Sequence, residues 1–107
     1  MKKTILIDKR AEKEIKDFHR LVQLKFQALL EILQSEGQLK EPFGKKLEGK
    51  THLFEVRVKH EGQYRALYAY ADKNKILILS AFIKKTQKTP LTELYKAKER
   101  LKNYERE

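Results

Sequence analysis

The pattern of apolar residues in the first third of the chain predicts a short strand followed by helix. Residues 2–7 contain the β-branched side chains typical of a strand, and Asp8 is suited to cap a following helix. Neither Pro nor Gly interrupts residues 9–36, so the pattern allows one long helix or two joined near His19–Leu21, before Gly37 ends it. Apolar residues at steps of three and four form one helical face: Ala11, Ile15, Phe18, Val22, Phe26, Leu29 and Leu33.

The middle of the chain predicts a connecting segment and then a strand. Residues 38–50 lose the helical period and contain Pro and Gly, which is typical of a connection. Residues 53–59 alternate between apolar and charged side chains, as in a strand with one face in the core. The expected core face carries Phe54, Val56 and Val58, and the other face carries Leu53, Glu55, Arg57 and Lys59.

A tight hairpin is expected next, and its loop length decides which side chains share a face. A three-residue loop at His60–Gly62, with the glycine in the left-handed conformation, sets Lys59 opposite Gln63. That register pairs Arg57 with Arg65, so the two arginines and Lys59 share one face, while Tyr64, Ala66 and Tyr68 face the core. A four-residue loop would send Arg65 to the other face.

Neighbouring cations on a sheet destabilise it by a few tenths to about 1 kcal/mol, so something should compensate. One explanation is structural: Glu55 lies beside Arg57, or the long side chains spread into solvent. The other is functional, namely that the cations are placed to receive a polyanion. The sequence leaves both open.

The last third of the chain predicts a buried strand and a closing helix. A polar turn at Asp72–Lys75 leads into Ile76–Phe82, an apolar run typical of a strand buried on both faces. It opens into a segment rich in lysines and threonines, which ends at Thr89 and Pro90. Thr89 is suited to cap a helix whose first turn contains Pro90. Residues 90–106 then place four residues on an inner stripe: Leu94, Ala97, Leu101 and Tyr104.

Length and charge limit the possible functions. We expect residues 1–107 to form one domain, soluble and cytoplasmic, because no apolar run is long enough to span a bilayer and the chain has no cysteine. The formal net charge is +10. Residues 1–43 have 9 basic and 7 acidic side chains (net +2), and residues 44–107 have 16 and 8 (net +8). This excess favours a phosphate-bearing partner.

Most catalytic motifs are missing from the sequence. The three histidines, His19, His52 and His60, are spread along the chain without a metal-ligand spacing, and we expect no metal and no cofactor. Glycine-rich phosphate loops are absent, and neither Ser35 nor Ser80 lies in a nucleophile motif. Cations remain. They can promote RNA cleavage without a metal, because the RNA 2′-hydroxyl is an internal nucleophile that needs alignment, a base and charge neutralisation.

An ordered set of motifs extends along the chain between Asp8 and Arg100. The motifs are Lys46–Gly49, Leu53–Arg57, Tyr64–Arg65, Phe82–Thr86 and Lys88–Pro90, with Ala97 and Arg100 in the last helix. This set resembles the RelE/ParE toxin superfamily, with its phage-derived, HigB-like branch the most similar. The resemblance implies an α+β, RelE-like fold. Its small, mainly antiparallel sheet has four strands, with an N-terminal helical hairpin on one face and a C-terminal helix.

The resemblance also implies an activity: ribosome-dependent cleavage of mRNA by 2′-hydroxyl attack, in a type II toxin–antitoxin system. The catalytic residues implied are Arg57, Lys59, Arg65 and Lys84. The residues implied to bind RNA are Lys45, Lys46, Lys85 and Thr86. Lys59 and Lys46 are the candidates for the general base, with His60 as a third.

Two other functions stay open at this point. The chain could inhibit DNA gyrase as a ParE-like binder, or it could be a degenerate toxin that only binds its antitoxin. All three functions imply a cognate antitoxin, acidic at the contact and carrying a helix-turn-helix domain as in HigA. The first implies the ribosome and mRNA as further partners, with no membrane and no small-molecule cofactor.

Overall fold

The computed structural model describes residues 2–49, 52–72 and 74–105. Lys50, Lys73 and Arg106, which the expected segments include, lie outside the described residues. The elements follow the order β1 (Thr4–Ile7), α1 (Lys9–Lys16), α2 (Arg20–Glu36), β2 (Gly44–Lys46), β3 (Phe54–Lys59), β4 (Gln63–Ala71), β5 (Lys75–Lys84) and α3 (Leu91–Glu105). The strands form one sheet in the order β1-β5-β4-β3-β2. Only β1 and β5 are parallel, and the other neighbours are antiparallel.

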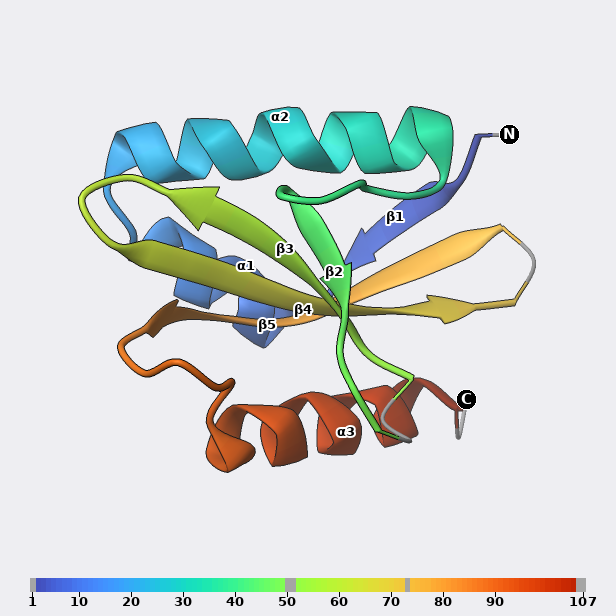
Figure 1. The fold of residues 1–107 in the computed structure, drawn as a ribbon. Coiled ribbons are helices and arrows are strands. Elements are labelled where there is room, and N and C mark those ends of the chain that lie inside the picture. Colours follow the sequence, from blue (N-terminus) through green and yellow to red (C-terminus); the bar gives the residue numbers. More distant parts are fainter. Residues whose placement is uncertain (1, 50–51, 73, 106–107) are drawn as a thin grey trace.

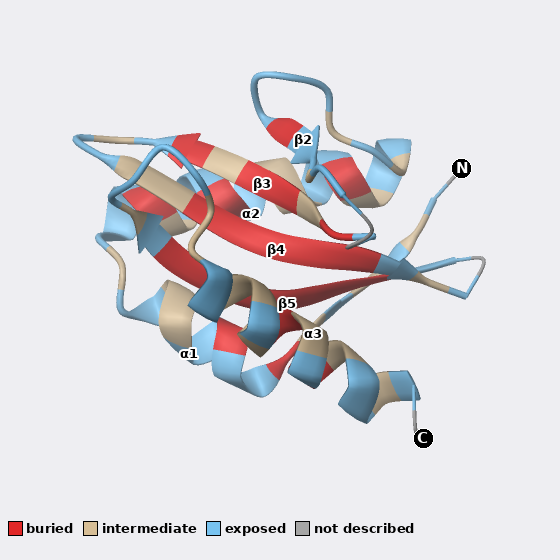
Figure 2. Ribbon diagram, turned by 60° about the horizontal axis from the view of Figure 1, so that its bottom comes forward, coloured by how far each residue is buried: buried red, intermediate tan, exposed pale blue. Residues whose placement is uncertain are grey.

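The sheet lies between two helical layers, with α2 along one face and α3 along the other (Figure 1). On the α1/α2 side, Val22 and Phe26 pack with Val56, Ala66 and Tyr68. On the α3 side, Ala97 packs with residues of β4 and β5. The middle strands are therefore buried on both faces (Figure 2), as the apolar run of β5 predicted.

The amino-terminal helical segment is a pair, which settles the question that the periodicity left open. Asp8 caps α1 by accepting a hydrogen bond from Arg10 N at 2.8 Å. His19 caps α2, because its Nδ1 accepts from Leu21 N at 3.1 Å. Gly37 ends α2 in the left-handed conformation (φ 81°). The helix is therefore interrupted at a residue that can cap the next helix, without the Pro or Gly that usually marks such an interruption.

The sheet that the described residues form has five strands, one more than the four expected. The additional strand, β2, lies in the segment read as a connection and has only three residues, too few to show alternation. It depends on Gly44, where a Cβ would lie 2.5 Å from Leu39 Cβ. From the sequence, Gly44 indicated a turn, but the structure requires a glycine there because the backbone passes close to Leu39.

The β3–β4 hairpin has the predicted register, with Arg57 opposite Arg65 and Lys59 opposite Gln63. His60 N donates to Gly62 O at 3.0 Å across the loop. The left-handed conformation expected of Gly62 is adopted by Glu61 (φ 51°), and Gly62 has a φ of 148°. The three-residue loop therefore forms, but with the positive φ angles distributed over two residues.

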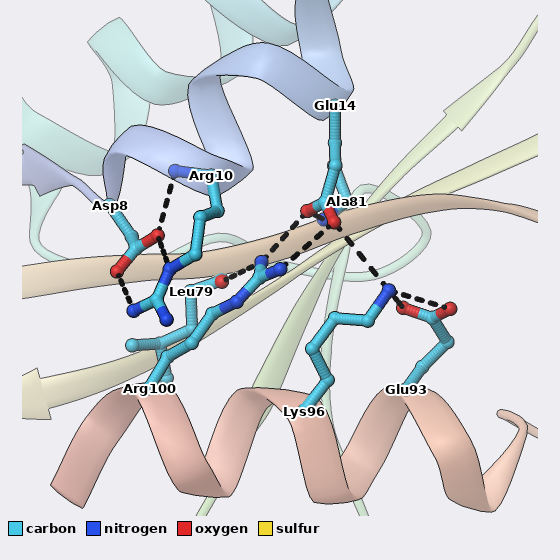
Figure 3. A network of polar contacts seen from close by, with 8 residues as sticks. All are labelled: Asp8, Arg10, Glu14, Leu79, Ala81, Glu93, Lys96 and Arg100. Atoms are coloured by element: carbon cyan, nitrogen blue, oxygen red, sulfur yellow. Dashed lines mark hydrogen bonds and ion pairs between the residues drawn. The ribbon is translucent and has the colours of Figure 1, made fainter. Parts of the chain in front are cut away.

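Helix α3 is held against the rest of the fold by a partly buried ion pair (Figure 3). Arg100 donates to Glu14 of α1 from Nη1 and Nη2, at 2.9 and 3.1 Å. The pairing of β5 with β1 ends at Ile78. Beyond this residue the ion pair satisfies two backbone groups of β5, because Arg100 donates to Leu79 O at 2.8 Å and Ala81 N donates to Glu14 at 3.1 Å. The side chains of Arg100 and Glu14 thus make the hydrogen bonds that a neighbouring strand would make with this part of β5. They also connect α1, β5 and α3.

Substitution Glu14→Gln should lower the free energy of unfolding at pH 7 by about 2 kcal/mol, because Arg100 would lose its charged partner. Burial alone would raise the pKa of Glu14, but hydrogen bonds from Arg100 and Ala81 hold it below the ordinary value of 4.5. A lowered pKa stabilises the fold above that value, and the contribution is lost as the pH falls.

Urea unfolding measured at several pH values tests this prediction. As the pH falls below 4.5, stability should fall more steeply in the native chain than in Glu14→Gln. Parallel pH profiles for the two proteins would contradict it. Glu12→Gln, which alters an exposed acid on the same helix, is the matched control.

Candidate functional site

The strand register gathers the predicted cations on the face of the sheet that α3 covers only in part. Arg57 and Arg65 are directly paired, and Lys45 of β2 pairs with Glu55. Lys84, the last residue of β5, pairs with Gln63, two residues before Arg65. Because successive side chains of a strand point to opposite faces, these residues share one face near the hairpin end of the sheet.

The carboxylate of Glu55 lies at the centre of this cluster and is 1% exposed. Its Oε1 accepts a hydrogen bond from Arg57 Nε at 2.8 Å and lies 3.7 Å from Arg65 Nε, an ion-pair distance too long for a hydrogen bond. Its Oε2 accepts from Thr89 Oγ1 at 3.4 Å. Glu55 therefore supplies the structural compensation for the paired arginines, and a single carboxylate faces several cations.

Thr89 does not cap α3 as the sequence predicted. The first turn of the helix instead uses the carbonyl of Pro90, which accepts from Glu93 N and Leu94 N at 3.0 and 3.2 Å. Thr89 is turned toward Glu55, and this connects the segment after β5 to the cationic cluster. The helix begins at Leu91, one residue later than predicted, and the hydroxyl of Thr89 contacts Glu55 instead of the helix end.

Arg65 is the most enclosed cation of the cluster, at 7% exposure. It donates to Tyr64 O at 3.0 Å and to Gln63 Oε1 at 3.2 Å. Burial lowers its pKa, and the neighbouring charge of Arg57 lowers it further while Glu55 opposes the change. Arg65 thus adds positive potential from within the sheet, whereas Arg57, which is less buried, has more access to solvent.

Lys84 combines partial exposure with an altered acidity. Burial lowers its pKa, Glu55 opposes the shift, and Arg65, Arg57 and Lys45 lower it further. A lysine with a lowered pKa holds a larger neutral fraction near neutral pH and is a better proton acceptor than an ordinary lysine. The sequence placed Lys84 among the catalytic residues but named other residues as candidates for the base. The strand register adds that Lys84 lies opposite Gln63, on the same face as Arg65.

The other predicted residues lie at the margins of this cluster or away from it. Lys59 is exposed beside it, and its carbonyl accepts from Lys25 Nζ at 3.0 Å. Lys46 pairs with Phe54 and lies over its ring, 6.0 Å from the centroid, on the opposite face. Lys85 and Thr86 are exposed after β5, where Thr86 Oγ1 donates to Lys88 O at 2.7 Å. Lys46 is therefore not brought to the cluster.

The fold also joins two histidines that are distant in the sequence. The rings of His19 and His60 lie 5.4 Å apart, where the hairpin loop meets the start of α2. Within the described residues, no group of three His, Cys, Asp or Glu side chains is arranged to hold a metal ion. His60 thus contacts a helix cap, at a position separate from the carboxylate of Glu55.

Comparison with known proteins agrees with this architecture. The family model described as phage-derived protein Gp49-like matches residues 13–102. No curated protein sequence matches the chain. A double mutant of Escherichia coli toxin RelE in the free state has a TM-score of 0.70 and 22% identity, over 94% of this chain and 98% of that chain.

Two toxin–antitoxin complexes contain similar chains. The match in the intact E. coli RelBE complex has a TM-score of 0.64 and 19% identity, over 78% of this chain and 99% of that chain. The match in the archaeal RelE–RelB complex from Pyrococcus horikoshii has a TM-score of 0.61 and 27% identity, over 78% and 96%. The fold is therefore RelE-like, as the sequence motifs implied.

Removing the charge of Glu55 should destabilise the protein. In Glu55→Gln, the enclosed Arg65 and its neighbour Arg57 lose their common counter-charge, and the free energy of unfolding should fall by about 2–3 kcal/mol. Lys45→Gln, on the adjacent strand, should change it by less than about 0.5 kcal/mol. Urea unfolding at pH 7 measures both, and equal stability of Glu55→Gln and the native chain would show that the arginines need no carboxylate.

Proposed function

Because the chain belongs to the phage-derived Gp49-like family and has a RelE-like fold, we propose that it is the toxin of a type II toxin–antitoxin system that cleaves mRNA on the ribosome. The observation that carries the proposal is the cluster of Arg57, Arg65 and Lys84 around one carboxylate. Such a cluster retains positive charge at an accessible end of the sheet, where a phosphodiester can bind.

Each cation has a distinct role in the proposed reaction. Lys84 accepts the proton of the 2′-hydroxyl, and the 2′-oxygen forms a bond to phosphorus. The bond from phosphorus to the 5′-oxygen breaks, and that oxygen takes a proton from water, which leaves a 2′,3′-cyclic phosphate and a 5′-hydroxyl. Arg57 neutralises the charge that develops on the phosphate oxygens, and Arg65 raises the positive potential behind it.

The proposed base differs from those that the sequence favoured. Lys46 lies on the opposite face of the sheet, and His60 packs against His19. Lys84 has cationic neighbours and a lowered pKa, which supports it over Lys59. Lys59, Lys45, Lys85 and the hydroxyl of Thr86 are proposed to contact the RNA backbone around the cleaved phosphate.

The proposed partners follow from the same similarity and from charge. Complexes of RelE-like chains with antitoxins support a cognate antitoxin, which we expect to be acidic at the contact and to carry a HigA-like helix-turn-helix domain. The ribosome and mRNA are the proposed targets, which places the reaction in the cytoplasm. Within the described residues, no helix is long and apolar enough to cross a membrane.

Induced expression in bacteria tests the activity. Primer extension should show new mRNA ends inside translated codons after induction of the native chain. Arg57→Gln should reduce their yield at least tenfold, because a charge-assisted contact to the phosphate is lost. Lys102→Gln, which removes an exposed cation on α3, should leave the yield unchanged.

Growth arrest with intact mRNA would contradict the nuclease proposal. A supercoiling assay with purified gyrase would then test the ParE-like alternative. Absence of both activities, with the antitoxin still bound, would indicate a degenerate toxin.

The role of Lys84 is tested by Lys84→Arg, which keeps the positive charge but cannot lose a proton near neutral pH. The variant should cleave ribosome-bound mRNA at least 100-fold more slowly, which is the usual effect of removing a general base. In the native chain the single-turnover rate should rise with pH and level off below 10.5, the ordinary pKa of lysine. Comparable rates and pH profiles for the two proteins would limit Lys84 to an electrostatic role.

A further inference from the structure

A second feature adjoins the cationic cluster: a cavity of about 560 Å³ at the edge of β3, between that strand and α2. Its apolar part includes Leu29 of α2, Val58 of β3 and Phe43 from the segment before β2. Its cationic part includes Arg57, Lys59 and Lys25, and no acidic side chain is among the residues that line it. Arg57 belongs to both the cavity and the proposed phosphate site, so one bound molecule can extend from one into the other.

The cavity exists because β2 is short. β2 pairs with β3 only as far as Val56, and the next backbone contact is the hydrogen bond from Arg57 N to Phe43 O at 2.8 Å. Toward the hairpin, the edge of β3 is bridged by Lys25, which donates to Lys59 O at 3.0 Å. The end of β2 and the hydrogen bond from Lys25 to Lys59 thus define the two ends of the cavity.

Phe43 is 54% exposed although its backbone is fixed. Its own N–H and that of Gly44 both donate to Lys40 O, at 2.9 and 3.1 Å, and its carbonyl accepts from Arg57. An exposed aromatic ring on an anchored backbone leaves its face available for stacking by a ligand. Aromatic rings beside cations are the usual way in which proteins hold single-stranded nucleic acid, with a base stacked on the ring and its phosphate on the cations.

We propose that this cavity binds an unpaired RNA base, stacked on Phe43, in the nucleotide whose phosphate contacts Arg57. The identity of the ligand as RNA rests on the proposed function. Charge selects this occupant, because the lining cations suit the phosphates of RNA and the apolar part suits the faces of a base. An antitoxin segment with acidic and apolar side chains is the competing occupant.

Gln63 gives the cavity a means of distinguishing bases. Its Oε1 accepts from Arg65 Nη2 at 3.2 Å, which fixes the amide with its oxygen toward the arginine. The amide nitrogen is then the group that can donate to a carbonyl or ring nitrogen of a base. The cavity therefore favours bases that present an acceptor at this position.

Fluorescence offers a direct test, because the chain contains no tryptophan. Phe43→Trp places a single indole in the cavity, and Tyr95→Trp places one at an exposed position of α3 as the control. Oligouridine should quench Phe43→Trp, and an abasic oligomer with the same number of phosphates should quench it far less. Equal quenching by the two oligomers, or equal quenching of the two variants, would overturn the proposal.

Cleavage of ribosome-bound mRNA supplies the second readout. Phe43→Leu, which keeps the side chain apolar but removes the ring, should slow cleavage about tenfold, whereas Phe43→Tyr should stay within about twofold. Tyr95→Leu, which removes an exposed aromatic ring elsewhere, should leave the rate unchanged.

The outcomes separate this inference from the proposed function. If Arg57→Gln slows cleavage and Phe43→Leu does not, the base-binding cavity is wrong and the nuclease stands. If the native chain cleaves nothing but oligouridine still quenches Phe43→Trp selectively, the cavity stands and the nuclease is wrong. Suppose that Phe43→Leu no longer binds the antitoxin but cleaves mRNA at the native rate, and that both oligomers quench Phe43→Trp equally. The cavity would then belong to the antitoxin, and the inference would be wrong.

Discussion

The site depends on the ion pairs of Glu55 with two arginines that the hairpin register places opposite each other. Two guanidinium groups on adjacent strands repel, and an enclosed one such as Arg65 also loses hydration. A carboxylate buried between them offsets both costs. The same carboxylate contacts Thr89, so the charge that permits the register also positions the segment leading from Lys84 to α3.

A second ion pair determines how much of the sheet stays accessible. Arg100 and Glu14 fix α3 against β5 and α1, over the apolar part of the face that contains Leu77 and Leu79. The helix begins only at Leu91, after the segment that follows β5. The hairpin end of the same face therefore keeps its cations near solvent, and the location of the site is a consequence of where α3 is held.

Sequence reasoning predicted the features that depend on local pattern. The alternation of β3 and the three-residue loop were enough to pair Arg57 with Arg65, because side-chain direction follows from period and register. Features that depend on contacts between distant segments were missed. β2 is too short to show a period, the hydroxyl of Thr89 was assigned to a helix cap, and His19 and His60 meet only in the folded chain.

The same distinction explains the change of proposed base. The sequence suggested Lys59 and Lys46 as the base, but it could not show which lysine is both partly buried and surrounded by cations. Lys46 lies one residue after Lys45, and this single step puts it on the other face, over Phe54. Lys84 is partly buried at the end of β5 and interacts with Arg57, Arg65 and Lys45, while Glu55 limits the shift of its pKa.

A phosphate bound at Arg57 would compete with Glu55 for that arginine. In the proposed reaction, binding of RNA would therefore be coupled to the ion pairs that hold the hairpin and to the acidity of Lys84.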